Sequence, residues 1–346
     1  MKTSSDRNHL RGPVLRSVSR SFYLSLRILP RPLRDPLSLA YLLARATDTI
    51  ADTPVPPADL RVEALSNLAR AIQGAAPRGT AAQLTDSFAA LQRDEAERTL
   101  IQHLPGLLEW LDEMEAGDRA EVRSVLEKIT RGQMLDLERF GGGASSSRRV
   151  RPMADTSTSI AAISTAAELD EYTYLVAGCV GEFWTRICFA HVAKFSERPE
   201  TEMRELGVQY GQGLQLINIL RDAGSDLRHG RCYFPADELR LLGIAPEEVL
   251  REPVRVAPIL EKWREKAERG LGAGIDYASA IRNRRIRFAT ALPALIGMRT
   301  LALLRDVDGA EVFDVGVKVP RSEVRKMMLT SALASPRSLR RAFQKL

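Results

Sequence analysis

Cysteine is scarce in this sequence, with three residues among 346. Cys179, Cys188 and Cys232 are too few and too scattered for a disulfide framework or a zinc site, so the composition favours a reducing, cytoplasmic setting. No apolar run reaches the roughly 18 residues of a membrane-spanning helix, and the N-terminus lacks the apolar core of a signal peptide. We therefore expect a soluble or peripherally bound protein.

Aromatic residues are also few, at 6%, and the alternating pattern of β-strands is almost absent. The Gly-x-Gly-x-x-Gly fingerprint is missing, which excludes a Rossmann domain as a source of dinucleotide binding. Apolar residues instead recur at helical spacing, as in residues 61–72, 122–140 and 203–222. Proline and glycine clusters separate these stretches. The pattern predicts an all-α protein of roughly ten helices, given a usual helix length of about 11–12 residues.

Acidic residues are outnumbered, with 44 Asp and Glu against 50 Lys and Arg, for a net charge of +6. Arginine dominates the basic residues, and its planar guanidinium suits phosphate groups. The charge fits a phosphorylated substrate, an anionic membrane or a nucleic acid. Because the basic residues are scattered, we expect no nucleic-acid partner. A non-catalytic lipid- or nucleic-acid-binding helical protein is the most distant alternative.

One stretch, residues 141–159, is rich in Gly, Ser and Arg and has no hydrophobic period. It could be a linker between domains. Helical patterns of the same kind flank it, however, and the composition does not change across it. We predict a flexible internal loop within a single domain over residues 1–346.

Two aspartate pairs interrupt otherwise apolar helical segments: Asp48 with Asp52, and Asp222 with Asp226. At about 100° per residue, each pair shares one narrow stripe with other polar residues. These are Tyr41 and Arg45 for the first pair, and Gln215 and Asn218 for the second. The remaining faces are apolar, which indicates helices that are buried nearly all round.

Buried carboxylates need cations or other partners, since desolvating an unpaired charge is costly. Mg²⁺ prefers oxygen ligands and typically takes one or two carboxylates together with water and substrate phosphate. The stripes therefore predict a cavity that holds Mg²⁺ and a diphosphate. The alternative is a solvated face with local salt bridges, from Asp48 to Arg45 and from Asp222 to Arg221 or Asn218. For one pair alone the two interpretations have similar weight, and two pairs together favour the metal.

Four segments, in this order, resemble squalene and phytoene synthases, the head-to-head prenyltransferases. They are "SVSRSFYLSLRILP" (17–30), "AYLLARATDTIAD" (40–52), "YTYLVAGCVGEFW" (172–184) and "GLQLINILRDAGSDLRHGRCYFP" (213–235). The resemblance covers most of residues 15–300. It implies a single isoprenoid-synthase domain with a central cavity, and two aspartate motifs on facing helices. It also implies that Mg²⁺ bridges these motifs to the diphosphate of a prenyl substrate.

Position by position, the resemblance implies three sets of site residues. The metal ligands are Asp48, Asp52, Asp222 and Asp226, and the reaction-centre residues are Tyr41, Arg45 and Tyr172. The substrate contacts are Ser19, Arg20, Ser21, Phe22, Gln215, Asn218, Arg221 and Arg231. Any one of these arginines could instead be a solvated surface residue, and either tyrosine a core residue. Thr53 stands where many family members have a third acidic residue, which leaves the number of Mg²⁺ ions open.

The C-terminal part indicates which family member this is. Residues 314–328, "DVGVKVPRSEVRKMM", resemble the squalene-synthase segment that contributes to NADPH binding, and residues 288–304 resemble the helix that lines the deep end of its cavity. Within the C-terminal extension 314–346, Lys318, Arg321 and Arg325 are the expected contacts to an NADPH phosphate. A solvated basic loop is the alternative for these three residues.

We therefore predict a squalene synthase. It would condense two farnesyl diphosphates to presqualene diphosphate and reduce this product to squalene with NADPH. A dehydrosqualene or phytoene synthase that needs no reductant is the alternative. Because the prenyl chains partition into lipid, we expect a cytoplasmic enzyme in peripheral contact with the membrane. Residues 335–346 are expected to form a short basic amphipathic helix at that surface.

Overall fold

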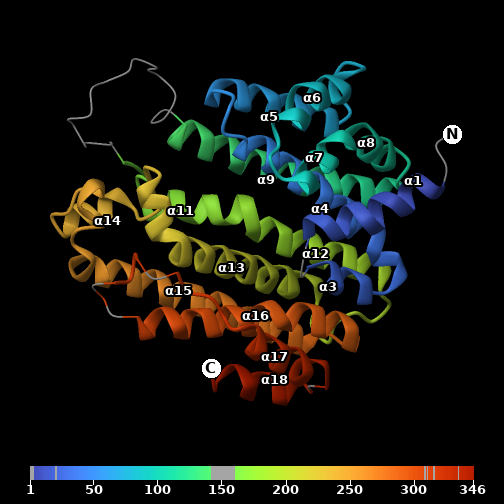
Figure 1. Cartoon of the computed structure of the whole chain (residues 1–346). Helices are drawn as coiled ribbons and strands as arrows, with labels where there is room; N and C mark the ends of the chain where they lie inside the picture. Colours follow the sequence, from blue (N-terminus) through green and yellow to red (C-terminus); the bar gives the residue numbers. More distant parts are fainter. Residues whose placement is uncertain are drawn as a thin grey trace. The chain divides into compact units, whose positions relative to one another are not determined.

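The computed structural model describes residues 4–19, 22–141, 160–307, 309, 311–314, 316–333 and 335–346 (Figure 1). The expected loop therefore lies outside the described residues except for Gly141. The all-α prediction is confirmed, because the described strands are only two residues long. The chain divides into two compact units, residues 1–141 with 186–193 and residues 142–185 with 194–346. Several helices are short, so there are more of them than the roughly ten expected.

Unit 1 begins with short helices and then contains longer ones. Its elements are α1 (Ser4–His9), the π-helix η1 (Leu10–Val14), α2 (Leu15–Ser19), α3 (Phe22–Ile28), α4 (Arg31–Asp52), α5 (Ala58–Ile72), α6 (Thr80–Phe88), the 3₁₀-helix η2 (Ala89–Leu91), α7 (Glu95–Gln102), α8 (Leu104–Asp112) and α9 (Ala116–Phe140).

Helix α4 is central to unit 1 and packs against α5, α7, α8 and α9 (Figure 1). Pro32 occupies its first turn, where the missing N–H costs nothing. Leu39, Leu42 and Leu43 are fully buried. The helix ends at Asp52, with Thr53 as its cap, and a proline-rich turn follows. A helix buried on most of its surface can present polar groups on only one narrow side.

Unit 2 is built around three long helices. Its elements are β1 (Ala161–Ala162), α11 (Ala166–Thr173), the π-helix η3 (Tyr174–Gly178), α12 (Cys179–His191, of which residues 186–191 belong to unit 1), α13 (Glu200–Arg228), β2 (Arg231–Cys232), α14 (Ala236–Leu241), the 3₁₀-helix η4 (Pro246–Glu248), α15 (Pro253–Ala280), α16 (Arg284–Asp306), α17 (Arg321–Leu333) and α18 (Pro336–Phe343).

Helix α13 packs against α15, α16, α11 and η3 within unit 2 (Figure 1). It comes very close to α12, because both helices have a glycine at the crossing. A Cβ on Gly181 would overlap the carbonyl group of Gly207. Strands β1 and β2 form a parallel pair that places Ala161 opposite Arg231. This pairing anchors the chain directly after the C-terminal end of α13.

The segment after α16 lies along the C-terminal part of α13. Phe313 is buried, its ring centroid is 6.2 Å from that of Phe234, and its carbonyl oxygen accepts a hydrogen bond of 3.0 Å from Arg228 Nη2. A Cβ on Gly224 of α13 would overlap the same carbonyl oxygen. The close approach of Phe313 to α13 therefore depends on a glycine at position 224.

Helix α16 corrects one expectation from the sequence. Among the described residues it is long and apolar enough to cross a membrane by length and composition. In the structure, 61% of its apolar window is buried. The hydrophobic residues of α16, including the segment 288–304, pack against α13, α15 and α17. Core packing within unit 2 accounts for the apolar composition of this helix.

The basic C-terminal end forms helix α18, as its sequence predicts. Its apolar side is not presented to a membrane, however. Leu339 is fully buried, α18 packs against α15 and α16, and Arg340 Nη2 lies 3.0 Å from Asp276 Oδ1. The expectation that this helix lies on a membrane through its apolar face is therefore wrong.

Candidate active site

The polar stripe of α4 is present in unit 1. Along residues 41–52, Tyr41, Arg45 and Asp48 are half-buried and Asp52 is exposed, whereas Leu42, Leu43, Ala46, Thr47, Thr49, Ile50 and Ala51 are buried. Helical periodicity explains this pattern, since residues three and four apart share a face. This is the grouping predicted from the helical repeat of the sequence.

Arg45 is the centre of the charge interactions on this stripe. Its Nη1 lies 2.5 Å from Asp48 Oδ2, and its Nη2 lies 2.5 Å from Glu97 Oε1. Partial desolvation of the Asp48 carboxylate and the negative charge of Asp52 raise the pKa of Asp48 to about 6, although Arg45 opposes this rise. Arg45 thus pairs with two carboxylates, and Asp52 adds a third negative charge nearby, which leaves an excess of negative charge that suits a bound cation.

Glu97 is not among the residues predicted from the sequence. It lies in the first turn of α7, where an acidic residue is already explained by the helix dipole. No motif or spacing connects it with α4, which lies about 50 positions earlier in the chain.

Of the site residues predicted in the N-terminal segment, the structure describes the side chain of Ser19 only. Ser19 is buried, and its hydroxyl donates to the Leu15 carbonyl at 2.5 Å, so that donor is used within its own helix. Tyr41 donates to the Val18 carbonyl at 3.3 Å, which ties α4 to α2. Arg20 and Ser21 lie outside the described residues. Phe22 begins α3, but its side chain is likewise outside the described part.

The second stripe lies on α13 in unit 2. Gln215, Asp222 and Asp226 are half-buried, and Asn218 and Arg221 are exposed, whereas Leu216, Ile217, Ile219, Leu220, Ala223, Gly224 and Leu227 are buried. Arg221 donates from Nε and Nη2 to the two oxygens of Asp222, at 2.8 and 2.6 Å. Asn218 Nδ2 lies 3.4 Å from Gln215 Oε1. As on α4, the helix presents carboxylates, amides and an arginine on one side.

Both local salt bridges that the sequence offered as an alternative are therefore formed, Arg45 with Asp48 and Arg221 with Asp222. All four side chains keep between 34% and 46% of their surface exposed. Ion pairs at such exposure contribute little stability. Arginine beside a carboxylate pair is also the arrangement that a metal–diphosphate complex would need, so the salt bridges do not exclude that function.

Tyr172, in the last turn of α11, stacks on Tyr233 with ring centroids 5.3 Å apart. Two contacts fix the turn before it: Gln212 of α13 donates to the Asp170 carbonyl at 3.1 Å, and Lys266 of α15 pairs with the Asp170 carboxylate. The π-helix η3 follows directly, a local distortion that is frequent at functional sites. Tyr172 remains half-buried, so part of its surface is accessible.

The remaining predicted residues also lie in unit 2. Arg231 is half-buried in β2, where its backbone pairs with Ala161. Lys318, Arg321 and Arg325 are all exposed. Helix α17 is held on α16 by an ion pair between Glu323 and Arg299, at 2.7 Å. The three residues predicted to contact a cofactor phosphate are thus exposed, Arg321 and Arg325 on α17 and Lys318 in the segment before it.

The donor set agrees with Mg²⁺ in its chemistry. Among the residues that the structure describes, no three His, Cys, Asp or Glu side chains are grouped as a metal site. Mg²⁺ does not require such a group, because it usually keeps several waters and binds one or two carboxylates together with phosphate oxygens. Each stripe supplies two carboxylates four positions apart. The residues therefore fit a magnesium–diphosphate complex.

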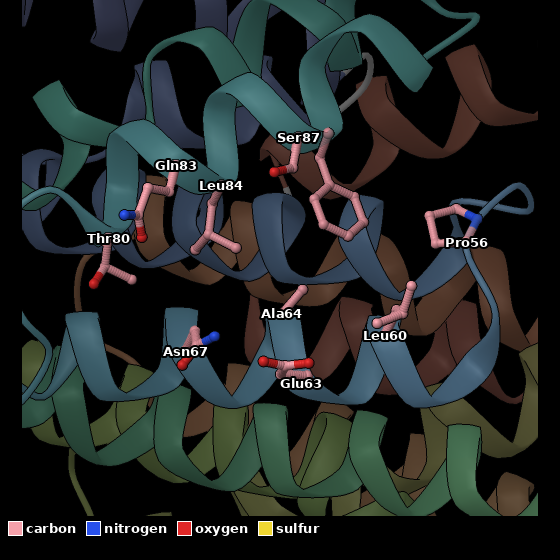
Figure 2. A pocket seen from close by; sticks show the side chains of 10 residues that line it. Pro56, Leu60, Glu63, Ala64, Asn67, Thr80, Gln83, Leu84 and Ser87 are labelled. Atoms are coloured by element: carbon pink, nitrogen blue, oxygen red, sulfur yellow. The ribbon is translucent and has the colours of Figure 1, made fainter.

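A separate groove of about 400 Å³ lies between α5 and α6 in unit 1. Figure 2 shows side chains of α6, among them Leu84 and Ser87, directed toward Leu60 and Ala64 of α5. Glu63 is the one charged residue among those that line it. None of the predicted site residues contributes to this groove, so we assign it no part in the reaction.

Comparison with known proteins gives a consistent result. The sequence model of the family described as squalene/phytoene synthase matches residues 15–323. A presqualene diphosphate synthase of Rhodopseudomonas palustris is 28% identical over 84% of both chains. The squalene synthase of Saccharomyces cerevisiae is 25% identical over 92% of this chain and 66% of its own length. A bifunctional lycopene cyclase/phytoene synthase of Colletotrichum graminicola is 28% identical over 69% of this chain, which spans only 36% of that protein.

Solved structures agree on the fold. The structure described as a complex of TcSQS with a ligand has a TM-score of 0.76 at 18% identity, covering 99% of this chain and 90% of that one. A dehydrosqualene synthase in complex with a ligand has a TM-score of 0.61 at 19% identity, covering 94% and 95%. At such identities the similarity establishes a common all-α fold, not a common activity.

Proposed function

Because the chain belongs to the squalene/phytoene synthase family and is thus a head-to-head prenyltransferase, we propose that it is a squalene synthase. The substrate would be farnesyl diphosphate, with presqualene diphosphate as the first product and squalene as the final one. The observation that carries the proposal is the polar stripe in each unit, with two carboxylates and an arginine on a helix whose neighbouring positions are largely buried and apolar.

Asp48 and Asp52 on α4, and Asp222 and Asp226 on α13, would hold Mg²⁺. When bound, the metal would supply the Lewis acidity that lets diphosphate leave. Arg45 and Arg221, each already next to a carboxylate of its stripe, would contact the remaining phosphate oxygens.

We also propose that Tyr172 serves the reaction centre. Its stacking on Tyr233 fixes the plane of the ring, and the contacts of Asp170 fix the turn that carries it. An aromatic face held in this way stabilises a nearby positive charge through its quadrupole. We propose the same role for Tyr41, which lies on the first stripe and whose hydroxyl donates to the Val18 carbonyl.

One observation favours squalene as the end product, and the segment that carries Lys318 and Arg321 lies within the family match, which ends at residue 323. The similarity to the yeast squalene synthase covers 92% of the chain, whereas the similarity to the phytoene synthase of C. graminicola covers 69%. NADPH, when bound near these residues, would supply the hydride. Presqualene diphosphate as the end product is the second candidate, because the R. palustris enzyme is similar along 84% of both chains.

Purified protein given farnesyl diphosphate, Mg²⁺ and NADPH is expected to yield squalene. Without NADPH it should accumulate presqualene diphosphate or release dehydrosqualene and alcohols, since the cation formed next has no positioned hydride donor. Chromatography of the extracted products measures this. Presqualene diphosphate as the main product with NADPH present would favour the second candidate. Dehydrosqualene or phytoene as the main product would contradict the proposed reduction by NADPH. It would still agree with a head-to-head condensation, of farnesyl diphosphate in the first case and of a longer prenyl diphosphate in the second.

Peripheral contact with membranes is part of the proposal, because prenyl chains and squalene partition into lipid. Since Leu339 of α18 is buried, we assign the contact to α17, where Leu329 is 73% exposed and lies one turn from the exposed Lys326. Leu329→Glu is expected to reduce co-sedimentation with anionic liposomes by about tenfold, because it removes an apolar contact and adds like charge. Leu241→Glu, at an 87% exposed leucine on α14, is the control. Equal effects of the two variants would argue against α17.

A further inference from the structure

The position of Glu97 next to Arg45 is the one feature of the first stripe that no motif explains. Glu97 keeps 28% of its side chain exposed, and its carboxylate lies 2.5 Å from Arg45 Nη2. The opposite nitrogen of the same guanidinium, Nη1, contacts Asp48 at 2.5 Å. Arg45 is thus held from two sides, by its own helix and by α7. Its Nε is buried and has no hydrogen-bond partner among the described residues.

Helix α7 is firmly connected to α4 at this point. Asp94 caps α7 and accepts hydrogen bonds from the backbone N–H groups of Ala96 and Glu97, at 2.8 and 3.2 Å. Just before the cap, the buried side chain of Gln92 donates to Thr53 Oγ1 at 2.9 Å. The Glu97 carboxylate is therefore carried by a capped helix whose preceding residues are bonded to the end of α4.

The same contacts show that the Thr53 side chain has a structural role at the end of α4. Its side chain is almost fully buried, and its hydroxyl donates to the Thr49 carbonyl at 2.7 Å while it accepts from Gln92. Position 53 thus cannot supply a further acidic group to the stripe. A further carboxylate reaches Arg45 from α7, through Glu97.

A bound cation would change the partners of Arg45. If Asp48 is a metal ligand, its oxygens are shared with the cation and become poorer acceptors for the guanidinium. Glu97 is then the remaining carboxylate that holds Arg45 from a fixed element. We infer that Glu97 is a positioning residue that keeps Arg45 directed at the substrate diphosphate when Asp48 is engaged by the metal. The inference rests on the proposed function, because it assumes a metal–diphosphate complex at this stripe.

The test measures binding of inorganic diphosphate by calorimetry, in the presence of Mg²⁺, for the full chain. Glu97→Gln is expected to weaken binding by about tenfold, because it removes a charge-assisted contact to Arg45. It should also raise the KM for farnesyl diphosphate more than it lowers kcat. Glu97→Asp keeps the charge and should recover part of the affinity. Glu95→Gln, an exposed acidic residue of the same helical turn, is the matched control and should bind as the unaltered protein does.

A double-mutant cycle separates positioning from a merely structural role. In an Arg45→Gln background, Glu97→Gln should cause no further loss of diphosphate affinity, because the residue through which it acts is absent. Additive losses would overturn the inference. So would a Glu97→Gln variant that melts at a lower temperature but binds diphosphate as tightly as Glu95→Gln does.

The proposed function fails by a different observation. Diphosphate binding that depends on Glu97 and Arg45, in a protein that makes no squalene, would sustain the positioning role and overturn only the assigned product. If the protein makes squalene but Glu97→Gln leaves its diphosphate affinity unchanged, the proposed function stands and the positioning role of Glu97 is overturned.

Discussion

Asp48→Asn and Asp222→Asn are each expected to lower turnover by about 10²–10³-fold or more while the helical fold persists. Each change replaces a carboxylate ligand by a neutral amide of the same shape, and loss of Mg²⁺ assistance to the leaving diphosphate removes several kcal/mol of transition-state stabilisation. Both side chains are more than 40% exposed, so little packing is lost. Initial rates of diphosphate release measure the turnover, and thermal melts measure whether the fold persists.

Asp86→Asn is the control for this experiment. Asp86 is exposed on α6, away from both stripes in the sequence and with no predicted role. Rates close to those of the unaltered protein in Asp48→Asn would mean that the first pair is a solvated face whose salt bridge to Arg45 is its whole role. The same result for Asp222→Asn would apply to the second pair. Partial recovery at raised Mg²⁺ concentration would support a weakened metal site.

Gly224→Ala is expected to detach the segment around Phe313 from α13 and to shift the products from squalene toward presqualene diphosphate. The added Cβ would overlap the Phe313 carbonyl oxygen, so either the segment or the helix must move. Overpacking of this kind usually costs about 1–3 kcal/mol. The segment leads directly into residues 314–328, the proposed NADPH contact, and the first condensation needs no reductant. Product ratios at saturating farnesyl diphosphate measure the effect.

Two variants make this result specific. Gly272→Ala places a Cβ in open space on α15, so it should leave both stability and product ratio unchanged. Phe313→Ala approaches the same contact from the other side, because it removes the ring that packs near Phe234. It should lower the squalene fraction as Gly224→Ala does. If both variants reduce the melting temperature without changing the product ratio, the segment has only a structural role.

Periodicity alone was sufficient to predict the all-α class and the two polar stripes. Which side of α4 carries Tyr41, Arg45 and Asp48 follows from the helical repeat, because one helix fixes the relative directions of its own side chains. For the same reason the helical C-terminal end could be predicted from residues 335–346. The number of helices could not, since short helices such as α14 depend on caps and on packing more than on a hydrophobic period.

The partners of these residues were decided by the tertiary structure. The sequence indicates that Arg45 can pair with Asp48 one turn away, but not that Glu97 shares it, because the approach of α7 to α4 is set by packing and by the hydrogen bond from Gln92 to Thr53. It indicates an amphipathic α18, but not that Leu339 is buried within unit 2. Local pattern determines which face of a helix is apolar or charged. The element that covers that face is determined by contacts between residues far apart in the chain, and no periodicity encodes those contacts.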